Sequence, residues 1–251
     1  MFHWIDAWAI ALAFAVAMFA SWYLGWRLGR RLHPEPGEDP GTKFTDASMA
    51  LLGLLLAFTF SMAMVRHDQR RLAVVAESNA IGDFNTCVTL LKEPKRADLQ
   101  NVIRNYTHLQ LDMLRQLLPA TEEENAFQRS REMQTQMTCK VAQAIDGSPM
   151  DLALTNTLNN LTSAHASRLA AYEEILPWSI VLLLLLSSIV PSFLIGMKQG
   201  ETHKLHHSGT LSFIVLVSLV IFVTLDLNQP RRGLIRVNRE PLERLTKSLD
   251  M

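Results

Sequence analysis

The chain has 251 residues, of which 49% are hydrophobic, and it carries 24 basic (Lys and Arg) and 24 acidic residues. This zero net charge excludes the strongly basic field that is typical of nucleic-acid-binding proteins, so no nucleic-acid partner is expected. The hydrophobic residues gather in long blocks that alternate with polar regions, which is typical of a membrane protein rather than of a uniformly soluble one.

Residues 1–65 are predicted to form a first transmembrane hairpin. The first apolar block, residues 4–26, has tryptophans near both ends, where aromatic side chains anchor a helix at the membrane interface. Arginines follow it instead of a small-residue cleavage site, so we expect a retained span and not a signal peptide. The Pro- and Gly-rich segment 33–41 reverses the chain, and residues 47–65 form the second span.

The second span is predicted to continue into water as one helix. No proline occurs between Thr45 and Leu91, and the apolar half passes at Arg66 directly into an amphipathic half. At about 1.5 Å per residue, such a helix would be roughly 70 Å long, whereas about 30 Å suffices for the hydrocarbon. We expect it to enter a helical soluble domain at residues 66–174, whose last helix, from Met150, could run on into the third span.

Residues 175–227 are predicted to form a second hairpin, with spans at 175–197 and 210–227, and residues 228–251 a basic C-terminal tail. The predicted fold is therefore all-α, with four spans and with long helices extending into a helical domain between spans two and three. An excess of arginine beside the domain and tail favours the cytoplasm for both and for the two termini. The first span favours the reverse, because its basic cluster follows it.

Two sets of residues on the second span are candidates for function. Small residues at four-residue spacing permit close helix packing within one chain, between subunits or beside a pore; they are Gly53, Ala57 and Ser61. A second set could line an apolar constriction that gates by dewetting, or could face lipid; it comprises Leu52, Leu55, Phe58 and Thr59.

Charged residues near the membrane ends form the third set of candidates. Arg66, Arg70 and Glu77 lie near one helical face, where they can pair internally, attract anions or anchor the helix at the interface. Asp226 closes the fourth span, and a carboxylate at membrane depth suggests a functional site. At this edge position, however, an ion pair with Arg231 or Arg232 is the favoured interpretation.

Nothing in the sequence suggests an enzyme, a cofactor or a strong metal site. The chain has no P-loop and no GxGxxG, GxSxG or HExxH motif. His203, His206 and His207 could bind a metal on a helix, but a pH-sensitive connection fits them better. Cys87 and Cys139 could pair in an oxidising compartment; in the cytosol they would be small apolar groups.

Several sequence blocks together resemble one family. LLGLLLAFTFS (51–61), R-x-D-x-R-R (66–71), ESNAIG (77–82) and DLNQPRRGLIRV (226–237) are similar to the bestrophin-like family of bacterial membrane proteins. The resemblance covers nearly the whole chain. The family's hallmark D-x-D-x-P-R-x-G has Asn228 in place of its second Asp here, and Ser78 stands where Ala is frequent. The first departure weakens any paired-carboxylate site at Asp226.

The resemblance implies a function that the residues alone do not. Bestrophins are pentameric anion channels with four spans and a cytoplasmic helical domain, and their second span lines the pore with an apolar neck. By that resemblance we expect a lipid-embedded homo-oligomer of the bacterial inner membrane, a pentamer by analogy, that passes a small anion. The bestrophin calcium-binding acidic cluster has no counterpart in the basic tail. The alternative is a non-conducting membrane sensor or scaffold whose helical domain binds a partner or ligand.

Overall fold

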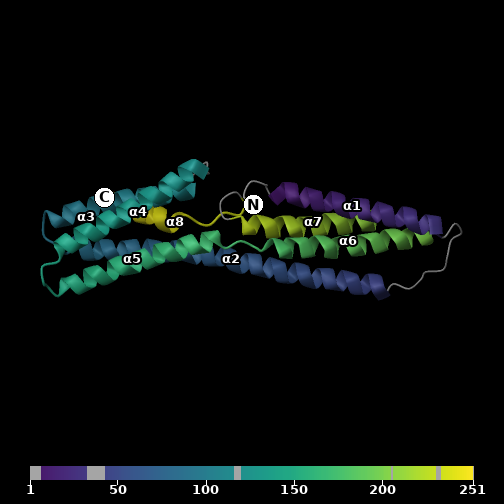
Figure 1. The fold of residues 1–251 in the computed structure, drawn as a ribbon, viewed down its shortest axis with the longest axis horizontal. Helices are drawn as coiled ribbons and strands as arrows, with labels where there is room; N and C mark the ends of the chain where they lie inside the picture. The colour runs from purple at the N-terminus through teal and green to yellow at the C-terminus, as the bar shows by residue number, and fades with distance from the viewer. Residues whose placement is uncertain (1–6, 33–42, 116–119, 205, 230–232, 251) are drawn as a thin grey trace. The chain divides into compact units, whose positions relative to one another are not determined.

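The structure, a computed structural model, describes residues 7–32, 43–115, 120–204, 206–229 and 233–250. Every regular element in these ranges is a helix, which confirms the all-α prediction (Figure 1). The helices are α1 (Ala7–Leu32), α2 (Lys43–Thr89), α3 (Lys95–Arg115), α4 (Ala120–Ala144), α5 (Met150–Glu173), α6 (Trp178–Glu201), α7 (His207–Asn228) and α8 (Glu240–Leu249). They belong to two compact units, each described by itself: unit 1 (Met1–Arg66 with Ile175–Ile235) and unit 2 (His67–Glu174 with Arg236–Met251).

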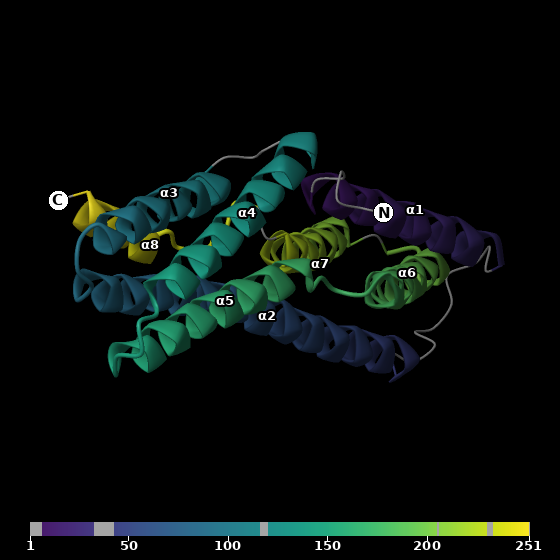
Figure 2. The ribbon, with the colours of Figure 1, turned by 60° about the vertical axis from the view of Figure 1, so that its left-hand side comes forward.

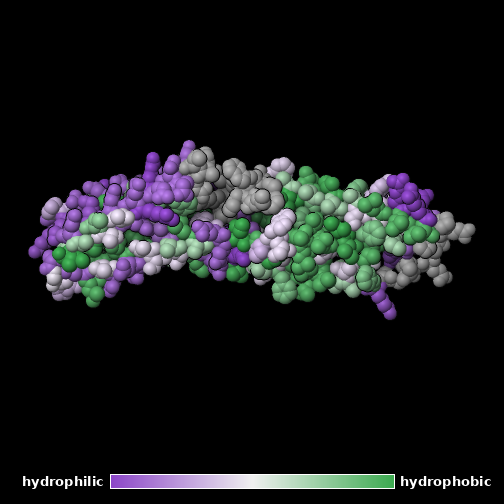
Figure 3. Space-filling view, in the orientation of Figure 1, coloured by the Kyte–Doolittle hydropathy of each residue, from purple (hydrophilic) through white to green (hydrophobic). Residues whose placement is uncertain are grey.

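Unit 1 holds the membrane-spanning part of the chain. Four helical segments among the described residues are long and apolar enough to cross a membrane, and they contain α1, the first half of α2, α6 and α7. Their buried side chains form one core that includes Phe14, Met18, Leu52, Leu184 and Ile221. The outer surface of this unit is also largely hydrophobic (Figure 3). An apolar exterior over an apolar core suits a protein whose solvent is lipid.

Helices α1 and α6 touch through their backbones. A Cβ atom added at Gly196 would lie 2.0 Å from the carbonyl oxygen of Trp22, and one added at Gly25 would lie 2.2 Å from that of Phe193. Gly29 and Gly200 are equally close to the facing backbone. Two GxxxG segments therefore face each other, which permits the close van der Waals contact that joins helices in lipid. The sequence pattern predicted a small-residue seam on α2 but gave no prediction of this contact.

The third span does not continue from α5, contrary to one expectation. Helix α5 ends at Glu173, the next residue has an extended ψ of 107°, and α6 begins at Trp178. Pro177 precedes α6 with φ −58° and ψ 139°. Proline disfavours helical geometry in the residue before it, and it has no backbone N–H to donate a helical hydrogen bond. The break between the two helices therefore follows from Pro177.

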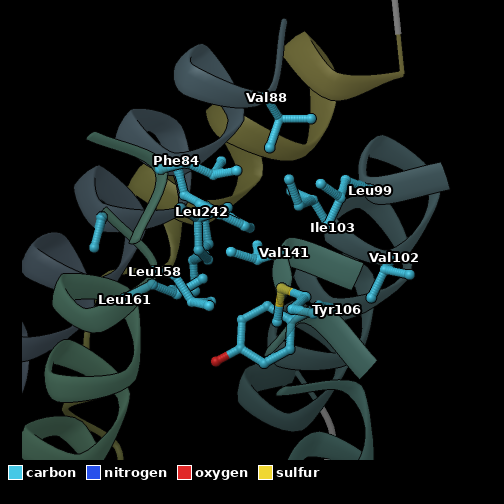
Figure 4. Close-up of a cluster of buried hydrophobic side chains, with 14 of the residues drawn as sticks. Phe84, Val88, Leu99, Val102, Ile103, Tyr106, Val141, Leu158, Leu161 and Leu242 are labelled. Atoms are coloured by element: carbon cyan, nitrogen blue, oxygen red, sulfur yellow. The ribbon is translucent and has the colours of Figure 1, made fainter. Parts of the chain in front are cut away.

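Unit 2 is a helical bundle built from the second half of α2 with α3, α4, α5 and α8 (Figure 2). Its core gathers apolar side chains from all five helices, and those of Phe84, Ile103, Val141, Leu158 and Leu242 point toward one another (Figure 4). The expected basic tail, residues 228–251, does not stay apart: residues up to 235 belong to unit 1, and 236–251 belong to unit 2. Helix α8 buries Leu242 completely, so this part of the tail belongs to the core of unit 2.

The glycine seam predicts a large effect from one added methyl group. Gly196→Ala should destabilise the protein by about 1–3 kcal/mol, because the new Cβ must push two helix backbones apart. Gly209→Ala is the matched control, since a Cβ there meets nothing within 4 Å. Thermal unfolding of the detergent-purified variants measures both, and equal midpoints would contradict the backbone contact.

Candidate functional site

A buried polar network crosses the core of unit 2. Four helices supply side chains that water hardly reaches: Glu77 from α2, Tyr106 and Gln110 from α3, Ser130 from α4, and His165 and Arg168 from α5. Polar groups at such depth are stable only when they bond to one another. These six side chains are therefore expected to bond to one another.

The carboxylate of Glu77 is the centre of this network. Its Oε1 accepts hydrogen bonds from the hydroxyl of Tyr106 (2.9 Å) and from Nδ1 of His165 (2.8 Å). Its Oε2 lies 2.7 Å from Nε of Arg168, an ion pair whose N–H bond is not aligned with the oxygen. Glu77 is fully buried and Arg168 is 3% exposed, so each charge depends on the other for compensation.

Amide and hydroxyl groups close the network into a ring. Arg168 Nη2 donates to the side-chain oxygen of Gln110, and Gln110 Nε2 donates to the hydroxyl of Ser130 at 2.7 Å. That hydroxyl lies 3.4 Å from Nε2 of His165, whose other nitrogen returns to Glu77. The ring thus joins all four helices by side chains alone. Such a closed network fixes how the helices align along one another.

The surroundings set the ionisation of Glu77 and Tyr106. Burial acts to raise the pKa of Glu77, but the charge of Arg168 and the hydrogen bonds from His165 and Tyr106 outweigh it, so this pKa lies below its ordinary value. For Tyr106, burial and then the charge of Glu77 raise the pKa well above its ordinary value. Glu77 is therefore an anion and Tyr106 a neutral donor at neutral pH.

Arg70 is buried as a helix cap and not displayed at the surface. Its Nε donates to the carbonyl of Ala171 (3.1 Å), and its Nη2 donates to that of Glu174 (2.6 Å). These carbonyls end α5, where helical carbonyls lack partners and a positive charge is favourable. Arg70 and Glu77 thus share a helical face, as expected, but both lie inside unit 2. Arg66, in unit 1, is half-buried, and its Nη1 has no hydrogen-bond partner among the described residues.

Asp226 closes a turn at the end of α7. Its Oδ1 accepts a hydrogen bond from the backbone N–H of Leu234 (2.8 Å), and its Oδ2 accepts one from that of Ile235 (2.9 Å). A Cβ at Gly233 would lie 2.7 Å from the backbone oxygen of Asp226, so the turn requires glycine there. The expected partners Arg231 and Arg232 lie outside the described residues. Oδ1 of Asn228, at the end of α7, accepts a hydrogen bond from the backbone N–H of Leu176 (2.8 Å).

The candidate residues of the second span do not share one face. Leu52 is 1% exposed and packs in the core of unit 1, and Thr59 is buried with its hydroxyl bonded to the carbonyls of Leu55 and Leu56. Leu55 is half-buried, whereas Phe58 is 62% exposed. The small residues Gly53, Ala57 and Ser61 are all exposed, and a Cβ at Gly53 would meet nothing within 4 Å.

Most residues of the buried network were not predicted from the sequence, although the sequence holds a signal for them. The buried positions of α5 follow a regular helical spacing, and His165 and Arg168 fall within it. In α3, Tyr106 and Gln110 lie one turn apart among buried apolar residues. Polar side chains on the apolar face of an amphipathic helix therefore mark the network. In the described ranges, no group of three His, Cys, Asp or Glu residues could hold a metal ion.

Comparison with known proteins gives a family and a fold. A family model described as the Bestrophin-like domain matches residues 8–242. The crystal structure of a mutant bacterial bestrophin homolog from Klebsiella pneumoniae is similar with a TM-score of 0.59 and 13% sequence identity, over 96% of this chain and 95% of that one. At this identity the likeness concerns the fold alone. No curated protein matches the chain.

The ion pair predicts a strong effect of neutralising Glu77. Glu77→Gln should lower the free energy of unfolding by about 3–5 kcal/mol, because it leaves the Arg168 charge buried without its partner. Glu132→Gln, at an exposed position of α4, should change it little. Thermal or chemical unfolding monitored by circular dichroism measures both variants. Similar losses in the two would show that Glu77 is not a centre of stability.

The lowered pKa of Glu77 predicts a specific acid dependence. Because the carboxyl is more acidic folded than unfolded, its contribution to stability is present above its ordinary value of 4.5 and is lost as pH falls through the lower, folded value. Melting temperatures between about pH 6 and about pH 3 should fall more steeply for the wild type than for Glu77→Gln. If the melting temperatures of the two proteins fell in parallel with pH, the lowered pKa of Glu77 would be refuted.

Proposed function

The chain belongs to the Bestrophin-like family, and from that premise we propose that it forms a homo-oligomeric anion channel in the bacterial plasma membrane. Its pathway runs between subunits along the membrane half of α2. The observation that carries this proposal is the outward apolar face of that half-helix, which bears Phe58. A face of this kind, repeated around an axis, forms an apolar neck that can gate by dewetting.

The burial pattern of α2 reduces the number of candidate residues that can line the pathway. Leu52 and Thr59 are used by the chain's own core, so the neck consists of Phe58 with the half-buried Leu55. Gly53, Ala57 and Ser61 are exposed, and a Cβ at Gly53 would meet nothing within 4 Å. We assign them to the contact with α2 or another span of an adjacent subunit, where small residues permit close approach.

Arg66 is the residue best suited to attract the anion. It lies where the apolar half of α2 ends, and its buried Nη1 has no partner among the described residues. Arg70 is unavailable, because its guanidinium caps α5. The arginine excess beside the domain and tail supports a cytoplasmic location for unit 2, for the termini and for the Arg66 end of the pathway. By analogy with bestrophins the assembly is a pentamer in contact with membrane lipid.

A second function is supported by the self-contained core of unit 2. A bundle with its own apolar cluster and polar network can bind a partner or ligand without any conduction. In that case the chain is a membrane sensor or scaffold. A monomer or dimer that carries no current favours this function over the channel.

Chloride flux into liposomes containing the purified protein tests the channel directly. The oligomeric state is measured in the same preparation by chemical crosslinking, so that failed assembly is recognised. The channel predicts chloride flux from the assembled oligomer. An intact oligomer that passes no chloride at either polarity of voltage would overturn the proposal.

A matched pair of phenylalanines tests the position of the pathway. Phe58→Ala should change single-channel conductance or gating, because it removes the bulk of the neck, and Leu55→Ala should act in the same direction. Phe19→Ala on α1 is the control, since Phe19 is similarly exposed at 53% against 62% for Phe58. Equal effects of Phe58→Ala and Phe19→Ala would place the pathway away from α2.

A further inference from the structure

Two neighbouring apolar side chains are exposed in the turn that follows α7. Leu234 is 81% exposed and Ile235 is 41% exposed. Single exposed apolar residues are normal on the surface of a soluble protein. These two, however, are adjacent, and only a short connection separates them from α7, a helix long and apolar enough to cross a membrane. Their place in the chain therefore points to lipid as the material that covers them.

The exposed apolar surface at this end of unit 1 extends to the start of α6. The backbone N–H of Leu176 donates to Oδ1 of Asn228 at 2.8 Å, so the segment before α6 lies beside the end of α7. Leu176 is buried together with Leu227, whereas Ile175 and Trp178 are 42% and 50% exposed. Tryptophan at the end of a span is typical of the boundary between lipid and water. The turn and Trp178 therefore belong to the same end of unit 1.

The two exposed residues do not need water for their own backbone N–H groups. The N–H of Leu234 and that of Ile235 donate to the two carboxylate oxygens of Asp226, at 2.8 Å and 2.9 Å. Asp226 is 4% exposed, and Gly233 lets the turn fold back onto its backbone oxygen. A backbone N–H that leaves water without a partner is costly. Because Asp226 supplies these partners, Leu234 and Ile235 can leave water together.

We propose that Leu234 and Ile235 insert into the interfacial region of the lipid bilayer, and that their turn is a membrane anchor held rigid by Asp226. The partner is the phospholipid surface, at the depth where headgroups give way to acyl chains. The inference rests on the membrane spans of unit 1 and not on the proposed channel. A chain that carries no ion would be anchored in the same way.

The polar groups of this end explain why the turn lies at the interface and not deeper. A carboxylate at the centre of the bilayer is costly, and the cost falls toward the boundary. Asp226 therefore favours a shallow position, although its oxygens are occupied by the turn. The indole of Trp178 has the same preference, because its ring is apolar and its N–H is polar.

Spin labelling of the full-length protein in phosphatidylcholine liposomes measures the depth of the turn. One nitroxide is attached to Leu234→Cys, in a background of Cys87→Ala and Cys139→Ala. Power-saturation EPR compares the accessibility of the label to oxygen, which concentrates in lipid, with its accessibility to a water-soluble nickel chelate. Oxygen accessibility should exceed nickel accessibility several-fold, because the side chain lies in lipid. Ile235→Cys should give the same result, and it carries the test if Leu234→Cys does not fold.

Two labelled positions of the same chain calibrate this measurement. Leu216→Cys, at a position of α7 that is 61% exposed, marks lipid. The natural Cys139, which is exposed on α4 of unit 2, is labelled in the Cys87→Ala protein and marks water. The oxygen-to-nickel ratio at Leu234 should lie between these two. A ratio as low as that at Cys139 would overturn the proposal. A label that neither reagent reaches would also overturn it, because a second copy of the chain or another protein surface then covers the turn.

The role of Asp226 is tested with the label kept at position 234. Asp226→Asn leaves one side-chain oxygen for two N–H groups, so the label should lose part of its oxygen-to-nickel ratio and gain mobility in the EPR spectrum. Asp83→Asn, at an exposed position of α2, is the matched control and should change neither. An unchanged label in Asp226→Asn would overturn the rigid anchor. If that variant does not fold, a freely mobile label in the unchanged turn would overturn it instead.

Discussion

The pairing of Glu77 with Arg168 is the interaction on which unit 2 depends. A carboxylate and a guanidinium are both removed from water there, and the loss of hydration is offset only if the charges stay together. Tyr106, Gln110, Ser130 and His165 supply the remaining hydrogen bonds. Since these groups come from four helices, a shift of any one helix along its axis would leave a buried polar atom unpaired. The network therefore contributes specificity of alignment more than net stability.

Helix α2 joins this network to the membrane part of the chain. In unit 1 it buries Leu52, Thr59 and Ala63, and in unit 2 it buries Arg70 and Glu77. These positions recur at helical spacings of four and seven residues, so one stripe of a single helix is buried in both units. The opposite surface of its membrane half is left for lipid or a second subunit. That division explains why Leu52 and Thr59 are buried in the core of unit 1 while Phe58 is exposed.

Unit 1 is held together by different physics. Apolar burial does not favour contact between two helices in lipid, since the lipid tails are as apolar as the side chains. Close backbone contact takes its place, and the glycines of α1 and α6 make it possible. At the end of α7, Asp226 binds two backbone N–H groups of the turn that follows. Among the described hallmark residues, Asp226 and Gly233 therefore have structural roles, and the buried carboxylate of Asp226 accepts hydrogen bonds from the main chain.

The sequence by itself determined the all-α fold, the apolar spans and the unbroken course of α2, because hydrophobic blocks, proline positions and helical periodicity are local signals. It also identified the family hallmarks and singled out Arg70, Glu77 and Asp226 as charged residues of interest. Only the tertiary structure decided what these residues contact: Arg70 caps α5, Glu77 meets Arg168, and Asp226 binds a turn. Their partners are distant in the sequence, and periodicity gives the buried face of a helix but not the helix that covers it. For the same reason the sequence predicted a small-residue seam on α2 but not the contact between α1 and α6, whose facing glycines are some 170 residues apart and meet only once the chain has folded.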